Sequence, residues 1–409
     1  MTRVCILGGS SPFTVALVDA IEGSEALSHR LGEWVLVLQG RNVQNVDAVA
    51  HYARHRLGAF GTSVISTTDL DAALADAEIV VVQTRFGGLE ARADDELFAS
   101  ELGCIADETL GPCGLLSAFR QIRPVDDLAI RMKAICPGAF VVNMINPLSL
   151  TTAMMLRHGL AAVGICELPL ATLQAFARAL RIDPTELCWS YEGLNHRGFI
   201  PIARTRDGED LLQRVLRLAP DSATQKYRDD ILRLGAISTK YFALFDGGAS
   251  HNKGRAVALI SLRDAIAGDL IADPTQCPAQ IAKRDMPWYA QAVVPLVAAR
   301  IGAQSYDATI NVAVDGPLVC ERRALVLGDR IDILESEPAN GPFRDWVAAF
   351  EHHERLCLAA LADPTPYTIG AALEADRITP SDKVRTAAAR IFRTWRDAAS
   401  NPPTVRGQQ

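Results

Sequence analysis

The feature that most constrains this chain is the regular alternation, over its first 165 residues, of short apolar runs with longer amphipathic segments. The runs are rich in β-branched residues and are expected to form strands: Arg3–Leu7, Trp34–Leu38, Ile79–Val82, Phe140–Val142 and Ala162–Ile165. Between them, Val43–Leu57 and Leu115–Ile135 have helical spacing. Strands that are apolar throughout and alternate with helices form a parallel sheet covered on both faces. We therefore expect an α/β fold with a doubly wound parallel sheet.

The pattern changes after Cys166, where helical segments dominate and short strand-like pieces interrupt them. The expected helices are Leu170–Leu180, Leu211–Leu218, Ala290–Ile301, Trp346–Ala362 and Lys383–Ala399, and the expected strands are Thr309–Val314, Ala324–Val326 and Ile331–Ile333. A chain of 409 residues is long enough for two domains of ~100–200 residues each. We expect a first domain over residues 1–166 and a C-terminal α+β domain over residues 167–409.

Composition and charge exclude several classes of protein. The net charge of −7 argues against nucleic acid or an anionic membrane surface as the main partner. No apolar run reaches the ~20 residues that a membrane-spanning helix needs. The nine cysteines stand singly without a CxxC pair, which is typical of a reducing compartment, and the chain starts without a basic and then apolar leader. We expect a cytoplasmic enzyme with no membrane or nucleic-acid partner.

A turn of small residues follows the first expected strand. Gly8, Gly9, Ser10 and Ser11 stand where that strand should lead into a helix. In a Rossmann-type dinucleotide-binding sheet this turn carries little side-chain bulk, so that a pyrophosphate can approach the backbone and the helix N-terminus. Ser10 replaces the second glycine of the usual pattern, so a plain tight turn is the alternative interpretation.

The second expected strand ends without the acidic residue that usually holds the adenosine ribose. The sequence there is Leu38-Gln39-Gly40-Arg41-Asn42. The guanidinium of Arg41 is suited to a 2′-phosphate, which makes NADP an alternative to NAD. A solvated surface arginine and a dinucleotide site that has decayed are the other interpretations.

Two longer series of motifs are more specific. The first runs from Gln83 to Arg92 (QTRFGGLEAR) and continues at Asp107–Gly114 (DETLGPCG). The second comprises the motifs Asn143-Met-Ile-Asn-Pro147, Gly164–Pro169 (GICELP) and Gly193–Gly198 (GLNHRG). In this order, and to about residue 320, the chain resembles a divergent member of glycoside hydrolase family 4. These are NAD- and metal-dependent 6-phospho-glucosidases, α-glucosidases, α-galactosidases and related enzymes.

The resemblance implies a fold related to lactate and malate dehydrogenases, with a dinucleotide-binding first domain and a second domain for substrate, metal and oligomerisation. It implies a glycosidase that oxidises the sugar at C3 with NAD, loses the C2 proton, eliminates the C1 substituent, adds water and returns the hydride. A divalent metal, usually Mn²⁺, would polarise the C2 and C3 oxygens. The implied substrate is a small, phosphorylated or otherwise anionic glycoside, and the implied assembly is a homodimer or homotetramer.

By the same resemblance, residues can be assigned expected roles. Cys166 and His196 would bind the metal, and an open site of this kind is catalytic rather than structural. The expected substrate-binding residues are Arg92 (for the distal group or phosphate), Glu108, Asn146 and Arg284. The turn after the first strand and the end of the second strand, argued above from the residues themselves, give the expected cofactor-binding residues Gly8, Gly9, Ser10, Ser11 and Arg41, and the resemblance adds Arg85. Each of these residue types is also compatible with a purely structural role.

The acid and the base are the positions where the chain departs from the family. Glu167 follows the metal cysteine, where α-specific members have Asp and β-specific members have Asn. A longer carboxylic acid can still protonate a leaving oxygen, so we expect Glu167 to be the general acid. Tyr241 matches the first tyrosine of the stretch that holds the base, but Phe245 occupies the last position. Tyr241 is therefore either the base or part of the cavity wall.

Two other functions stay open on the same scaffold. One is a sugar or 2-hydroxy-acid dehydrogenase with net oxidation, and the other is a repurposed, non-hydrolytic protein. The thiol at Cys166 favours the glycosidase, because an ordinary hydroxy-acid dehydrogenase needs no metal-binding thiolate.

Overall fold

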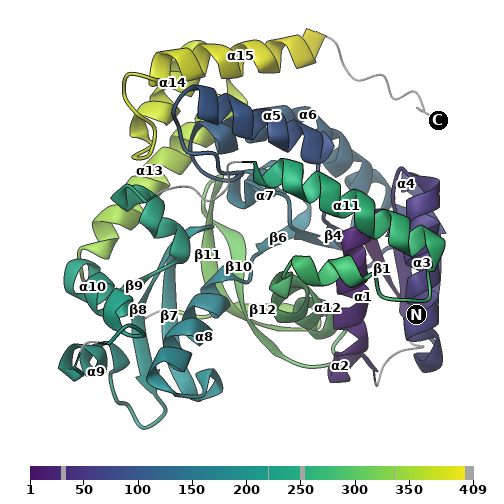
Figure 1. The fold of residues 1–409 in the computed structure, drawn as a ribbon, viewed down its shortest axis with the longest axis horizontal. Coiled ribbons are helices and arrows are strands. Elements are labelled where there is room, and N and C mark those ends of the chain that lie inside the picture. Colours follow the sequence, from purple (N-terminus) through teal and green to yellow (C-terminus); the bar gives the residue numbers. More distant parts are fainter. Residues whose placement is uncertain (29–33, 220, 249–253, 336, 401–409) are drawn as a thin grey trace.

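The computed structural model describes residues 1–28, 34–219, 221–248, 254–335 and 337–400 (Figure 1). Its first half contains six parallel strands in the order β3-β2-β1-β4-β5-β6. They are β1 (Thr2–Leu7), β2 (Trp34–Gln39), β3 (Ser63–Thr67), β4 (Ile79–Val82), β5 (Phe140–Asn143) and β6 (Ala161–Ile165). The expected doubly wound parallel sheet is thus confirmed, and five of its strands lie within a residue or two of their expected bounds. The sixth, β3, was missed because this edge strand alternates exposed and buried residues instead of forming an apolar run.

Antiparallel strands extend this sheet beyond β6. The order continues β10-β11-β7-β8-β9, and β12 pairs with β11. They are β7 (Leu187–Leu194), β8 (Arg197–Thr205), β9 (Ile237–Ser238), β10 (Tyr306–Asp315), β11 (Leu318–Leu327) and β12 (Arg330–Ile333). The strands β10, β11 and β12 contain the three expected strand pieces, whereas the β7–β8 hairpin was not expected. The sheet is continuous across residue 166, and the division into two domains there stays a prediction.

Helices cover both faces of the parallel strands (Figure 1). On one face, α1 (Val15–Glu22), α3 (Val43–Leu57), α11 (Arg255–Ala272) and α12 (Val294–Arg300) share a core with inward residues such as Val4, Leu36 and Val81. On the other face, α6 (Gly111–Ile135), α7 (Leu148–Leu156) and α13 (Phe343–Ala362) to α15 (Val384–Ser400) pack on Cys5, Val37 and Val80. Helix α14 of this group spans Pro366–Ala375. The remaining α-helices are α2 (Glu25–Ser28), α4 (Leu70–Leu74), α5 (Gly88–Glu101), α8 (Leu168–Leu180), α9 (Leu211–Arg217) and α10 (Gln225–Leu234).

A buried ionic cluster attaches the β7–β8 hairpin to the helices behind it. The guanidinium of Arg197, at the start of β8, pairs with Glu354 of α13 and also lies 3.0 Å from His353 Nδ1. The hydroxyl of Ser149 on α7 donates to the other oxygen of Glu354. Because a buried charge that loses its partner is costly, this cluster holds the hairpin at one position against α7 and α13.

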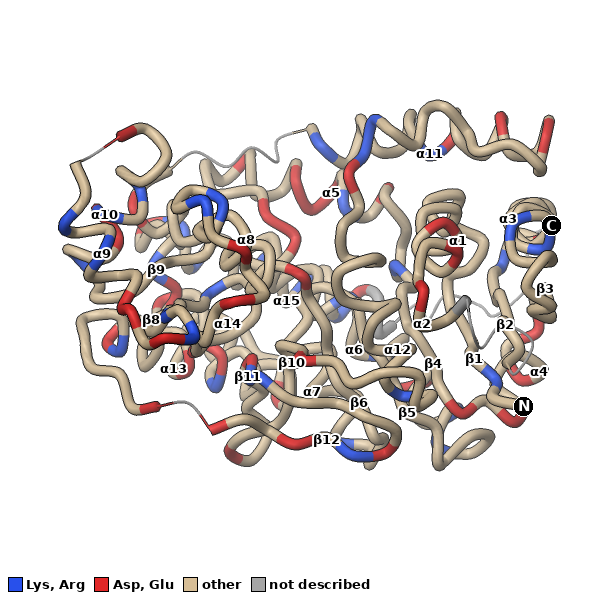
Figure 2. The backbone as a smooth tube through the Cα atoms, turned by 90° about the horizontal axis from the view of Figure 1, so that it is seen from below, with Lys and Arg blue, Asp and Glu red and all other residues tan. Residues whose placement is uncertain are grey.

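Charged residues and cysteines are distributed over the whole described structure. Acidic and basic residues are interspersed along the chain (Figure 2). All nine cysteines are free thiols. Among the described residues, no helix combines the length and apolar character needed to cross a membrane.

Candidate active site

A cavity of about 1800 Å³ opens at the carboxyl ends of the parallel strands, where ligands of doubly wound sheets bind. Every predicted site residue except Gly9 lines it. These residues are Gly8, Ser10, Ser11, Arg41, Arg85, Arg92, Glu108, Asn146, Cys166, Glu167, His196, Tyr241 and Arg284. Residues from the glycine turn and from each of the five motifs therefore meet in one cavity with Arg41, Tyr241 and Arg284. Two of the lining residues, Gly8 and Arg284, are 276 positions apart in the chain.

The turn after β1 forms one end of the cavity. Gly8 has φ of +91°, a conformation that favours glycine. A Cβ on Gly9 would approach Leu38 Cβ to 3.0 Å, so the turn packs tightly on the end of β2. The N–H groups of Gly8 and Gly9 both donate to the carbonyl of Gln39, at 3.0 and 2.7 Å. Gly9 is thus a packing residue behind the turn, and Ser10 and Ser11 are the turn residues with Gly8 that face the cavity.

A polar bridge that the sequence analysis missed links this turn to the second half of the chain. The Gln83 side chain, just after β4, donates to Thr14 Oγ1 at 2.9 Å and to the Gly8 carbonyl at 3.3 Å. Its oxygen accepts a hydrogen bond of 2.8 Å from the Tyr289 hydroxyl. Gln83 opens the QTRFGGLEAR motif, but nothing in the sequence pairs it with Tyr289.

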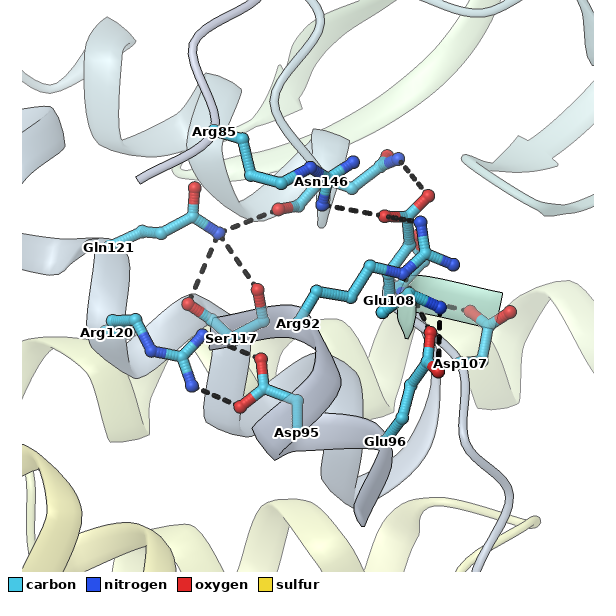
Figure 3. Close-up of polar contacts among 12 residues, drawn as sticks. Arg85, Arg92, Asp95, Glu96, Asp107, Glu108, Ser117, Arg120, Gln121 and Asn146 are labelled. Atoms are coloured by element: carbon cyan, nitrogen blue, oxygen red, sulfur yellow. Dashed lines mark hydrogen bonds and ion pairs between the residues drawn. The ribbon is translucent and has the colours of Figure 1, made fainter. Parts of the chain in front are cut away.

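Glu108 is the centre of the polar network at the other end of the cavity (Figure 3). Its carboxylate pairs with Arg85 at 2.9 Å and with Arg92 at 2.8 Å, and it accepts a 3.3 Å hydrogen bond from Asn146. Burial acts to raise the pKa of Glu108, but the two guanidinium groups outweigh it and hold that pKa well below its usual range. Glu108 is therefore an ionised hydrogen-bond acceptor at any physiological pH.

Arg92 is buried and already paired with two carboxylates. Its side chain is 6% exposed, and its Nε pairs with Glu96 at 2.9 Å while its Nη1 pairs with Glu108. Gln121 donates to the Asn146 carbonyl at 2.7 Å and so fixes Asn146, which hydrogen-bonds to Glu108 (Figure 3). These contacts engage Arg92 in holding Glu108, and they leave its expected contact with a distal phosphate as a prediction.

Cys166 and Glu167 lie between the end of β6 and the start of α8. Burial raises the pKa of the Cys166 thiol well above its usual range, and the carboxylates of Glu167 and Glu321 add to this effect. A hydrogen bond from Asn195 acts in the opposite direction. The Cys166 Sγ lies 3.7 Å from Glu167 Oε2. Without a cation the thiol is protonated.

His196 forms the tight turn between β7 and β8. Its backbone has φ of +65°, and its carbonyl accepts a 3.2 Å hydrogen bond from Thr239 Oγ1. The imidazole is buried, and Nδ1 has no hydrogen-bond partner among the described residues. Burial lowers the pKa of His196 to about 3, although Glu108 opposes this. The ring is therefore neutral, and a neutral imidazole is the form that binds metals.

Tyr241 lies against His196. The two rings stack with centroids 4.0 Å apart and planes within 8°. Burial and the nearby carboxylates of Asp107 and Glu108 raise the pKa of Tyr241, so the phenol is protonated. Residues 240–246 form a 3₁₀ helix, which turns Phe245 away from the cavity and onto Trp346 and Phe350. Of the two candidate positions for a base, only Tyr241 lines the cavity.

Glu321, on β11, supports the His196 turn and was also missed from the sequence. Its fully buried carboxylate accepts hydrogen bonds from the Tyr191 hydroxyl at 2.7 Å and from the amides of Asn195 and Asn311, both at 3.2 Å. The three donors come from β7, the turn and β10. Glu321 therefore fixes Asn195, the residue that contacts Cys166 and precedes His196.

Arg284 differs from the other arginines of the cavity. Its guanidinium lies over the rings of Phe13 and Trp288, at 4.3 and 5.3 Å from the centroids. Its Nε is buried and has no hydrogen-bond partner in the described part of the chain. Burial lowers the pKa of Arg284 to about 10, which leaves the side chain positively charged at neutral pH. Arg284 is available for an anionic group.

The metal-binding capacity of the site is limited. Within the described ranges, no three His, Cys, Asp or Glu side chains are grouped closely enough to hold a metal ion. Cys166 and His196 would thus form an incomplete ligand set, whose remaining positions a substrate or water would fill.

Comparison with known proteins shows what the chain is similar to. A model described as "Family 4 glycosyl hydrolase" matches residues 3–182. A probable 6-phospho-beta-glucosidase of Bacillus subtilis is 28% identical over 321 residues, which cover 72% of each chain. The phospho-alpha-glucosidase PagL of Clostridium acetobutylicum is 27% identical over 219 residues, and here the alignment spans 52% of this chain and 48% of that protein.

Solved structures extend the similarity in fold to nearly the whole chain. A 6-phospho-beta glucosidase from Thermotoga maritima with manganese, NAD+ and glucose-6-phosphate has a TM-score of 0.79 at 20% identity, over 97% of this chain and 99% of that one. A lactate dehydrogenase from Cryptosporidium parvum has a TM-score of 0.56 at 15% identity, over 89% and 99% of the two chains. The expected relationship to the lactate dehydrogenase fold is confirmed.

The depressed pKa of His196 predicts a pH-dependent stability of the metal-free protein. The unfolded chain takes up this proton near pH 6.5 and the folded chain only near pH 3, so the stabilisation is complete above pH 6.5 and is lost as the pH falls. Between pH 7 and pH 5 we expect His196 to account for a loss of about 2 kcal/mol. Urea unfolding of the wild type and of His196→Asn, which tolerates the positive φ, measures the difference. Equal pH dependence of the two proteins would contradict a buried neutral imidazole.

Proposed function

We propose, from the premise that the chain belongs to family 4 of the glycosyl hydrolases, that it hydrolyses small glycosides with a bound nicotinamide dinucleotide and a divalent cation. The observation that most supports this function is that Cys166, His196, Tyr241 and Glu108 line the same cavity as the glycine turn. An ordinary hydroxy-acid dehydrogenase needs no metal-binding thiolate in the cavity that also contains the dinucleotide turn. We therefore place hydrolysis ahead of net oxidation.

The residues present fit both absent groups. His196 Nδ1, which has no hydrogen-bond partner among the described residues, and the Cys166 thiol offer one nitrogen and one sulfur donor to a divalent cation, whose open positions sugar hydroxyl oxygens or water would fill. Gly8, Ser10 and Ser11 would hold the dinucleotide. Gln83 donates to the Gly8 carbonyl and is itself held by the Tyr289 hydroxyl, so both residues keep the turn in place. When bound, the dinucleotide supplies reversible hydride transfer and the cation polarises sugar hydroxyl oxygens.

The chain's own residues then have distinct tasks. The ionised Glu108 accepts hydrogen bonds from sugar hydroxyls, and the side-chain amide of Asn146 donates to them. The paired arginines keep the Glu108 carboxylate ionised. Tyr241 would be the residue that takes the proton from sugar C2, and a cation bound at His196 would supply the positive charge that lowers the pKa of its phenol. Glu167, next to Cys166, protonates the leaving oxygen.

Arg284 is a candidate partner for an anionic group on the sugar. Arg85 and Arg92 are already paired with Glu108, whereas the buried Nε of Arg284 has no hydrogen-bond partner in the described part of the chain. The named relatives are phospho-glucosidases, and we extend this to a 6-phosphorylated glycoside here, with Arg284 as its phosphate partner.

We further propose that residues 1–166 bind the dinucleotide, that residues 167–409 provide metal, substrate and subunit contacts, and that the enzyme is a cytoplasmic homodimer or homotetramer.

The decisive assay follows two products in one reaction. With nitrophenyl 6-phosphoglycosides, Mn²⁺ and dinucleotide, we expect release of nitrophenol without net formation of reduced dinucleotide, and loss of release when a chelator is added. Unphosphorylated nitrophenyl glycosides serve as the matched control for the anionic group. Reduced dinucleotide in equal amount to the substrate consumed would instead establish a dehydrogenase. The absence of any thermal shift with dinucleotide and Mn²⁺ would indicate a repurposed protein.

The proposed base makes a separate prediction. Tyr241→Phe keeps the stacking on His196 but removes the group that accepts the C2 proton, so exchange of that proton with deuterated solvent should fall ~10²–10⁴-fold. Mass spectrometry of recovered substrate measures the exchange. Tyr227→Phe, at a tyrosine that packs on Phe176 outside the cavity, is the control and should exchange normally. Unchanged exchange in Tyr241→Phe would move the base to another residue.

A further inference from the structure

We infer that the dinucleotide site of this chain is built for a 2′-phosphorylated cofactor, NADP rather than NAD, and that Arg41 binds the 2′-phosphate. The inference rests on the proposed function, because it assumes that a nicotinamide dinucleotide occupies the cavity. It goes beyond that function by assigning which of the two cofactors the adenosine end selects.

The end of β2 lies directly beside the turn that would hold the pyrophosphate. The Gln39 carbonyl accepts the N–H groups of both Gly8 and Gly9. A Cβ on Gly40 would lie 2.2 Å from Ser10 Cβ, so the two segments are in close contact. With the pyrophosphate on this turn, the residues after Gln39 would lie next to the adenosine ribose. In doubly wound sheets this is the position that distinguishes a free 2′-hydroxyl from a 2′-phosphate.

No carboxylate stands at this position. The Gln39 side chain is almost fully buried and its amide reaches back to the Thr68 carbonyl at 3.4 Å. Gly40 has no side chain, and Asn42 uses its oxygen to cap α3 through the Asn45 N–H at 2.9 Å. A 2′-hydroxyl would thus lack its usual anionic acceptor, and the repulsion that excludes a 2′-phosphate from NAD-specific sites is also missing.

Positive charge is available instead. Arg41 is exposed, lines the cavity and forms no ion pair with any described residue. It precedes the N-terminus of α3, a helix of 15 residues whose first turn contains no acidic side chain. The helix dipole and the guanidinium therefore act in the same direction on a dianionic phosphate. The carboxylate of Asp71, which also lines the cavity, is paired with Arg131.

The same end of the cavity offers an apolar surface for the adenine ring. Helix α4 packs against β2 and β3, and its Asp71 joins it to Arg131 of α6. Leu70 of α4 and Ile130 and Ala134 of α6 line the cavity there. A flat base between these side chains would direct its ribose towards the Arg41 segment, which completes a binding site for 2′-phosphoadenosine.

The test is a comparison of binding affinities, independent of catalysis. Titration calorimetry of the full-length protein should give an NADP⁺ affinity at least ~10-fold tighter than that for NAD⁺, and adenosine 2′-phosphate should compete where adenosine 5′-phosphate does not. Arg41→Gln should weaken NADP⁺ binding by ~10-fold or more and leave NAD⁺ binding within about twofold. Arg41→Lys, which keeps the charge without the fork, should retain part of the preference.

Lys133→Gln removes one charge outside the cavity and is the matched control, with both affinities unchanged. NAD⁺ binding equal to or tighter than NADP⁺ binding in the wild type would overturn this inference and leave the proposed function intact. Equal losses of both affinities in Arg41→Gln would also overturn it, because the guanidinium would then act on the shared part of the cofactor. Binding of neither dinucleotide would contradict the proposed function itself.

Discussion

The partly buried ion pair between Arg92 and Glu108 is the interaction on which the rest of the site depends. It joins α5 to the segment before α6, and the buried guanidinium of Arg92 is compensated by Glu108 together with Glu96. Because Arg92 and Arg85 both neutralise Glu108, the carboxylate stays ionised and accepts hydrogen bonds. Arg284 lines the same cavity, and its Nε has no hydrogen-bond partner among the described residues.

The groups assigned to metal binding and proton abstraction carry no charge by themselves. Burial keeps the Cys166 thiol and the Tyr241 phenol protonated and the His196 imidazole neutral. A bound divalent ion would lower the pKa of the Cys166 thiol and of the Tyr241 phenol, because its positive charge stabilises the thiolate and the phenolate. The supports behind these groups, Glu321 on one side and the Arg197–Glu354 pair on the other, hold the His196 turn before any ligand binds. Preorganisation of this kind limits the free energy spent on ordering the site.

The sequence predicted the parallel half of the fold because its strands are apolar on both faces, and helix α3 matches its expected bounds. The β7–β8 hairpin, which contains the His196 turn, was not predicted from the sequence. Strand β7 mixes buried and half-exposed residues and so forms no apolar run. Motif order brought Cys166, His196 and Glu108 together correctly in one cavity. The pairing of Glu108 with Arg85 and Arg92, and the separation of Tyr241 from Phe245 by a 3₁₀ turn, depend on tertiary packing that no spacing encodes.

The central claim is that the Cys166 sulfur and the His196 imidazole share one divalent cation, and cobalt spectroscopy tests it most directly. Titration of metal-free protein with Co²⁺ should produce a sulfur-to-cobalt charge-transfer absorption that saturates at one equivalent, because a thiolate ligand gives such a band. Cys166→Ser should abolish the band, and Cys188→Ser, at an exposed thiol, should keep it. A band that survives in Cys166→Ser, or its absence from the wild type, would contradict the account.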